Sequence, residues 1–169
     1  MAKQRRRDER EERVEGAMVE TVIKIFRCST VVKGGRRFSF SALVVVGDGA
    51  GRVGLGYGKA KEVPLSVEKG TKEAHRNAFD VKLKGTTIPH QVVGRYKATS
   101  VLLKPARPGT GLIAGSAVRA VLEAAGVKDM LTKVYGAGNT RNIAKATLAG
   151  LQSLKTRQEM EELRGVKIG

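Results

Sequence analysis

The fold of the first half of this chain is decided by residues 32–60, which have the sequence VKGGRRFSFSALVVVGDGAGRVGLGYGKA. Apolar side chains stand at every second position from Phe38 to Val44, and this period of two places them on one face of a β-strand. Residues 47–51 predict a turn, because glycine adopts positive φ at little cost and aspartate bonds its own backbone. The glycine-rich residues 52–59 predict the partner strand, where missing side chains let another backbone approach closely. We therefore expect an antiparallel hairpin here.

Positive charge dominates this region and the whole chain. Between Thr21 and Lys61 there are eight Lys or Arg residues and one acid, Asp48. The 169 residues hold 32 Lys or Arg and 16 Asp or Glu, for a formal net charge of +16. Surfaces that need only be soluble usually intersperse both signs, whereas a one-signed excess predicts a polyanionic partner. A basic sheet surface against nucleic acid is therefore the first hypothesis, and a merely solvated basic surface is the alternative.

Two glycine motifs in this region imitate nucleotide-binding sites. Residues 49–54, GAGRVG, satisfy the dinucleotide fingerprint, but that fingerprint must open a helix whose N-terminus holds the pyrophosphate. Residues 55–58 contain two glycines, which would cost a helix about 2 kcal/mol relative to alanine. Gly58-Lys59 resembles a phosphate loop, but Val53 and Ala60 stand where Gly and Ser or Thr are needed. We predict hairpin glycines and expect no cofactor.

The cysteine, histidine and apolar residues argue against disulfide-rich, membrane-spanning and enzymatic proteins. Cys28 is alone, so a disulfide framework or a cysteine metal cluster is not expected, and a reducing compartment is favoured. The longest apolar run, residues 42–46, is too short to span a bilayer, and the five acids up to Glu15 are unlike a transit peptide. The alternative hypothesis is a nucleotide-binding enzyme, which would need a general base held beside a nucleophile or a metal. No spacing pairs Cys28, His75 and His90, so we expect a cytoplasmic, non-enzymatic protein without a metal or membrane partner.

The remainder of the first half completes a small domain. Residues 1–17 mix basic and acidic side chains and predict an arm whose partner stays open. Residues 19–32 predict a strand, followed by a turn over residues 33–36 with Gly34-Gly35 as its central pair. Pro64 predicts a helix start, and small residues at helical spacing predict its buried face: Val67, Thr71, Ala74 and Ala78. Residues 18–81 should therefore form three antiparallel strands backed by one helix.

The second half alternates strands and helices. Strands are expected at 92–93, 99–103 and 130–135, and helices over 112–125 and after Asn139, which can cap the second helix. Gly126 stands where the first helix needs its C-terminal cap. This order predicts an α/β layer domain over residues 86–153. Thr156 and Glu159 form a capping-box pattern in a tail of residues 154–169. The fold class is thus α+β, with two small α/β domains.

A series of short motifs runs in unbroken order over about residues 18–153. The first half contains VKGGR (32–36), FSF (38–40), VVGDG (45–49), GRVG (51–54), GYGKA (56–60) and EVP (62–64); the second contains GTG (109–111), IAG (113–115), RAVLE (119–123), AG (125–126) and YG (135–136). This series resembles the bacterial family of ribosomal protein five of the small subunit. The resemblance implies an N-terminal domain like a double-stranded-RNA-binding domain and a C-terminal domain with a left-handed β-α-β crossover. It also implies a structural constituent of the small ribosomal subunit that supports assembly, mRNA entry and translational accuracy. A free-standing RNA-binding regulator is the alternative.

The resemblance also implies partners. These are the small-subunit (16S) rRNA, the small-subunit proteins four and eight, protein three, and mRNA at its entry path; no homo-oligomer is expected. The 33–37 loop resembles the family's long loop, which reaches rRNA near the spectinomycin site. With the charge pattern, this gives the expected rRNA contacts: Lys33, Arg36, Arg37, Phe38, Arg52, Lys59, Lys61, Arg95 and Lys97. For Phe38, packing in the strand core is the favoured role, and stacking on an RNA base is the alternative.

Gly111 and Arg119 match positions where the family meets protein four, a contact linked to accuracy. At Gly111, just before the expected helix, any side chain should intrude on a close neighbour. Arg119 should point away from the buried stripe of that helix, where its guanidinium can pair with a carboxylate. The alternatives are an ordinary turn glycine and a solvated or phosphate-bound arginine.

Overall fold

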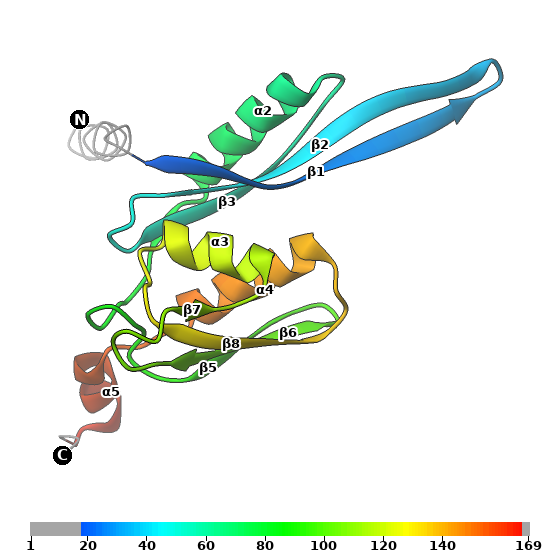
Figure 1. The fold of residues 1–169 in the computed structure, drawn as a ribbon. Coiled ribbons are helices and arrows are strands. Elements are labelled where there is room, and N and C mark those ends of the chain that lie inside the picture. Colours follow the sequence, from blue (N-terminus) through cyan, green and yellow to red (C-terminus); the bar gives the residue numbers. More distant parts are fainter. Residues whose placement is uncertain (1–17, 167–169) are drawn as a thin grey trace.

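The computed structural model describes residues 18–166, arranged in four layers (Figure 1). Helix α2 covers one face of the first sheet, helices α3 and α4 lie between the two sheets, and the second sheet forms the far layer. The expected arm of residues 1–17 lies outside the described range. The α+β class with two domains is confirmed, and the middle helical layer joins them.

The first sheet has the strand order β1-β2-β3-β4, and all of its pairs are antiparallel. Its strands are β1 (Val19–Val32), β2 (Gly35–Gly47), β3 (Arg52–Ala60) and the unexpected short β4 (Phe79–Asp80). Val32 pairs with Gly35, so Lys33 and Gly34 are the two turn residues. The expected Gly34-Gly35 centre is therefore wrong by one position. The turn follows from the β1–β2 register, which the buried part of the hairpin fixes.

The glycines of β3 are explained by α2 (Val63–Arg76). A Cβ atom at Gly54, Gly56 or Gly58 would lie 1.9 to 2.1 Å from a carbonyl oxygen of α2. Strand and helix backbones therefore touch directly. The fully buried face of the helix consists of its smallest residues, Ser66, Gly70 and Ala74. Of the expected set only Ala74 is among them, and the other three members are half-buried. Because β3 has glycines at these positions, the backbone of α2 packs directly on the strand through its smallest residues.

The second sheet has the order β5-β6-β8-β7, in which β7 and β8 are parallel and the other pairs antiparallel. Its strands are β5 (Val92–Tyr96), β6 (Thr99–Pro105), β7 (Leu112–Ile113) and β8 (Met130–Gly136). The helices are α3 (Ser116–Ala124), α4 (Thr140–Gln152) and α5 (Arg157–Arg164).

One helix of the second half differs from expectation. Residues 112–113 are not its first turn but strand β7, because Leu112 and Ile113 pair with Met130 and Leu131. The expected caps are present: Asn139 accepts a hydrogen bond from the Arg141 N–H, and Thr156 with Glu159 forms the capping box of α5.

The two domains share one hydrophobic core. Leu43 and Val45 of β2 belong to the same buried cluster as Val118, Val121 and Leu122 of α3. The β2–β3 loop closes against the end of α3, where the Gly49 N–H donates to the Ala124 carbonyl over 3.1 Å. A Cβ atom at Gly126 would lie 2.0 Å from the Gly49 carbonyl oxygen. Backbone from one domain therefore fits directly against backbone from the other.

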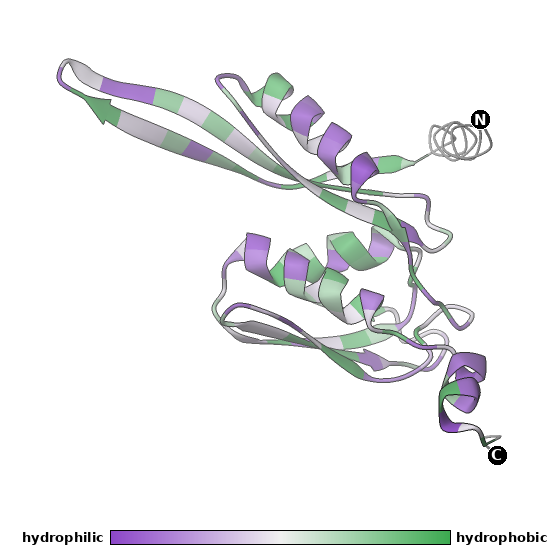
Figure 2. Cartoon of the chain, turned by 180° about the vertical axis from the view of Figure 1, so that it is seen from behind, coloured by the Kyte–Doolittle hydropathy of each residue, from purple (hydrophilic) through white to green (hydrophobic). Residues whose placement is uncertain are grey.

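The β1–β2 hairpin continues well beyond the helices on both sides of the first sheet (Figure 1). Residues 42–46 are 0% exposed, whereas residues 31–38 are all exposed. Hydropathy alternates along the hairpin, where hydrophilic segments of β2 lie beside the hydrophobic end of β1, and α5 is mostly hydrophilic (Figure 2). The hairpin is thus anchored in the core at one end and free of the layers at the other.

Candidate nucleic-acid interface

The tip of the hairpin holds three of the expected rRNA-binding cations. Lys33 lies in the turn, and Arg36 and Arg37 follow at the start of β2, where all three are exposed. Neighbouring strand residues point to opposite faces, so the two arginines present positive charge on both faces of the ribbon. No carboxylate occurs in the sequence between Glu20 and Asp48 to neutralise them.

Phe38 lies beside these cations and outside the core. Its side chain is 49% exposed, and the Arg27 guanidinium stands 4.8 Å from the centre of its ring. Core packing, the role favoured for Phe38 from the sequence, is therefore wrong. Arg27 was not singled out from the sequence. The signal lies in the β1–β2 register, which pairs Arg27 with Phe40 and makes Phe38 its diagonal neighbour on the same face.

The other expected rRNA contacts do not form one surface with the tip. Lys59 pairs with Ser41 on β2, and Lys61 follows in the turn before α2; both are exposed. Arg52 lies at the opposite end of β3 and is half-buried, and its Nε atom is buried without a hydrogen-bond partner among the described residues.

Arg95 and Lys97 belong to the second domain. A Cβ atom at Gly94 would lie 2.0 Å from the Ala146 carbonyl oxygen, so Gly94 faces α4 and its neighbour Arg95 points to the outer face of the sheet. Lys97 is exposed in the β5–β6 turn with a φ of 52°. The expected set therefore divides into the hairpin tip, the β3–α2 turn, the isolated Arg52 and two separate positions on the second domain.

Gly111 has a backbone conformation that favours glycine. Its φ is 76°, and a Cβ atom built there would have nothing within 4 Å among the described residues of this chain. Its N–H donates to Asp129 Oδ1 over 2.9 Å. Hydrogen bonds from the Gly111 N–H and the Thr86 side chain, with weaker ones from the Gly109 and Thr110 N–H groups, lower the pKa of Asp129. Asp129 thus organises this loop, a role that was not predicted from the sequence although Asp129 is the single acid between Glu123 and Glu159.

Arg119 is exposed on α3, as expected from the buried stripe of that helix. Its Nη2 lies 3.4 Å from the Leu112 carbonyl oxygen, directly after Gly111. The fold therefore brings the exposed Arg119 close to the half-buried Gly111 at the start of β7.

The residues with catalytic or metal-binding chemistry lie on separate elements: Cys28 on β1, His75 on α2 and His90 before β5. Across residues 18–166, no group of three or more His, Cys, Asp or Glu residues could hold a metal ion. The helices in the same range are all too short or too polar to cross a membrane.

Comparison with known protein families covers both domains. The family described as "Ribosomal protein S5, N-terminal domain" matches residues 18–82, and "Ribosomal protein S5, C-terminal domain" matches residues 94–164. The chain belongs to the ribosomal protein S5 family. Its resemblance to that family, inferred from the ordered motifs, is confirmed.

Curated relatives agree over most of their length. The small ribosomal subunit protein uS5 of Rhodopirellula baltica is 54% identical over 166 residues, which cover 98% of this chain and 94% of the relative. The protein of the same name from Rubrobacter xylanophilus is 55% identical over 149 residues, covering 88% and 74%. That from Chloroflexus aurantiacus is 55% identical over 145 residues, covering 86% and 82%.

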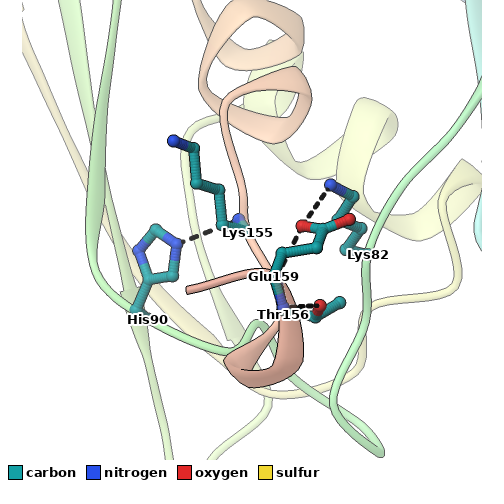
Figure 3. A network of polar contacts seen from close by, with 5 residues as sticks. All are labelled: Lys82, His90, Lys155, Thr156 and Glu159. Atoms are coloured by element: carbon teal, nitrogen blue, oxygen red, sulfur yellow. Dashed lines mark hydrogen bonds and ion pairs between the residues drawn. The ribbon is translucent and has the colours of Figure 1, made fainter. Parts of the chain in front are cut away.

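The S5 family match includes α5, which the sequence motifs did not reach. Figure 3 shows how this helix is fixed: Lys82 Nζ lies 2.6 Å from Glu159 Oε2, and the same oxygen accepts the Thr156 N–H over 3.1 Å. The Lys155 N–H donates to His90 Nε2 over 3.1 Å. The hydrogen bond from Lys82 is the main cause of a lowered pKa at Glu159. These contacts hold α5 against the segment that connects the two S5 domains.

Proposed function

We propose that this protein is a structural, non-enzymatic constituent of the small ribosomal subunit and binds small-subunit (16S) rRNA through the tip of its β1–β2 hairpin. The observation that carries this proposal is the exposed ribbon beyond the helices, with Lys33, Arg36 and Arg37 at its end and no carboxylate along it. The names of the relatives favour a ribosomal role over a free-standing RNA-binding regulator.

The mechanism is electrostatic and steric. Structured RNA presents phosphates and ribose hydroxyls, and proteins recognise it largely by shape. A ribbon with cations on both faces can neutralise phosphates on two sides when it enters an RNA crevice. The ladder of the hairpin continues to Val32 and Gly35, so little backbone freedom has to be lost on binding.

The same proposal includes protein partners and the roles expected from the family. Arg119 is exposed and its guanidinium contacts the residue after the half-buried Gly111, which supports a seam with small-subunit protein four. Contacts with proteins eight and three, and with mRNA at its entry path, complete the proposed environment. Through these contacts the protein supports assembly and translational accuracy.

Sedimentation of the native protein tests the proposal. We expect stable co-migration with small ribosomal subunits, and a free pool alone would contradict it. Replacing Lys33, Arg36 and Arg37 by glutamine should lower the salt dependence of rRNA binding by about 0.7–0.9 log units per lost phosphate contact. The matched control removes three other exposed cations by the variant Lys69→Gln, Arg76→Gln, Lys128→Gln. An unchanged salt slope in the hairpin variant would remove the tip from the proposal.

A further inference from the structure

A second group of cations lies where α4 meets elements of both domains. The Arg141 guanidinium, in the first turn of α4, stands 4.0 Å from the centre of the Tyr57 ring on β3. Lys145 lies one turn later on the same side of the helix, and its Nζ is 5.2 Å from the Tyr96 ring on β5. Lys97, in the β5–β6 turn, has its Nζ 5.9 Å from the same ring. We call these five residues the tyrosine–cation row.

The row is accessible and positively charged. Arg141 and Lys97 are exposed, and Lys145 and the two tyrosines are half-buried. None of the three cations takes part in an ion pair within residues 18–166. The sequence of α4 contains no acid, and neither does the segment with β5 and β6. The carboxylate of Glu73 accepts the Tyr57 N–H over 2.9 Å and so is engaged with the backbone.

The placement of these cations is unfavourable for folding alone. A positive side chain in the first turn of a helix opposes the helix dipole, and like charges four residues apart repel. Asn139 already caps α4, so Arg141 is not needed there as a cap. The contact of Arg141 with Tyr57 can be explained as a clamp between the domains. That explanation does not extend to Lys145 and Lys97, because their ring contact lies wholly within the second domain.

We propose that the tyrosine–cation row is a second RNA-binding surface, which holds backbone phosphates across the junction of the two domains. A polyanion removes the repulsion among the three cations and satisfies the helix dipole. The contacts with Tyr57 and Tyr96 are already made by cations, so the row should bind phosphate and not stack bases. This inference rests on the proposed function, because it takes rRNA as the partner.

The test compares three full-length variants with the wild type on a transcript of small-subunit rRNA across a range of salt concentrations. The row variant is Lys97→Gln, Arg141→Gln, Lys145→Gln; the other two are the hairpin variant and the matched control defined above. We expect the row variant to lower the salt slope by about 0.7–0.9 log units per lost contact, and the control to change it far less. An equal change in the row and control variants would show that binding follows total charge alone and would overturn the inference.

The outcomes separate this inference from the proposed function. A hairpin variant with a lowered slope beside a row variant with the wild-type slope overturns the row and leaves the proposed function standing. A wild-type protein that does not bind the transcript overturns the proposed function. A row variant that keeps its RNA slope and loses binding to polyglutamate assigns the row to an acidic protein segment, which also overturns the inference.

A double variant keeps the test informative if the triple one folds poorly. Lys97→Gln with Lys145→Gln leaves the Tyr57–Arg141 contact intact, so its melting temperature should match that of the wild type. About two-thirds of the slope change should remain, since two of three contacts are lost. A lowered melting temperature with an unchanged slope would make the row a structural feature only.

Discussion

The two halves of β2 are parts of one strand under different constraints. Residues 42–46 are fully buried between α2 and α3, and their side chains are small and aliphatic. Residues 35–38 are exposed, and there the strand contains two arginines and a phenylalanine. The alternation of side chains is the same in both halves. The two halves differ in whether helices cover their faces. The core strand continues beyond its helices and there supports the tip that we propose binds RNA.

The outer half depends on the inner half. A two-stranded ribbon without a covered face is marginal in water by itself. Here its register is continuous with that of the buried half, where a shift by one residue would move every core side chain of β2 from one packed face to the other. A bulge at Val22–Lys24 is the single irregularity in the β1–β2 pairing. The comparison therefore predicts that the inner half controls stability and the outer half controls RNA binding.

The largest expected effect comes from truncating the inner half. Leu43→Ala removes a fully buried side chain from the core that the domains share and should lower the free energy of unfolding by about 2–5 kcal/mol. Phe38→Ala, its control in the outer half, should change it by no more than about 0.5 kcal/mol. Urea unfolding checks both. Because the core is shared, one cooperative transition should shift, and movement of only one of two transitions would contradict the shared core.

A smaller loss is expected where the strand meets α2. Gly56→Ala places a methyl group 1.9 Å from the Gly70 carbonyl oxygen, which belongs to helix backbone. The two backbones must separate, at a cost of about 1–3 kcal/mol. Gly34→Ala at the hairpin turn meets nothing within 4 Å and should be nearly neutral. Thermal melting of the two variants compares how tightly the backbone is packed in the two halves. Equal decreases in melting temperature would contradict the account.

Helix α3 also has a buried and an exposed face, so substitutions on its exposed face should affect binding and leave stability unchanged. Arg119→Glu changes its exposed side and should weaken association with small-subunit protein four by about 1–3 kcal/mol, with decoding accuracy altered. The buried Val118 and Val121 on the other side are untouched, so the fold should be intact. Binding assays with protein four and a misreading reporter measure the two effects. Normal assembly with normal accuracy would count against the seam.

The smallest expected effect is a loss of stability in α5 at low pH, which should leave both halves of β2 unchanged. The lowered pKa of Glu159 means that its bonds with Lys82 and Thr156 contribute stability above the unfolded-state pKa of about 4.3. That contribution is lost as the pH falls through the lower pKa of the folded state. The protection of α5 amides against hydrogen exchange, relative to the intrinsic rate at each pH, should therefore fall below about pH 4. Glu159→Gln should show fast exchange in α5 already at neutral pH, and slow exchange there would show that other contacts hold the helix.

Local signals in the sequence predicted most of the fold. The β-branched and aromatic residues of 19–32 gave the first strand, and the capping residues Asn139 and Thr156 located two helices. Strand β7 was missed because Leu112 and Ile113 also fit helical spacing, and only their pairing with distant β8 decides between the two. The turn was displaced because its position follows from a register set far down the hairpin.

The candidate sites were only partly predictable for a similar reason. Composition identifies cations, and it correctly marked the basic hairpin tip as exposed. It could not identify Arg27 or Arg141, because their importance depends on rings that the fold brings to them. It also could not find Asp129 as the organiser of the loop at Gly111, since that contact joins separate segments.

Hydrogen exchange along β2, with and without the small-subunit rRNA transcript, tests the central claim most directly. In the free protein, residues 42–46 should exchange slowly and residues 35–38 quickly, because only the inner half is covered by helices. Adding the transcript should slow exchange in the outer half and leave the inner half unchanged. Equal protection of both halves in the free protein, or no added protection of the outer half when the transcript is present, would contradict the claim that the hairpin is anchored by one end and binds RNA with the other.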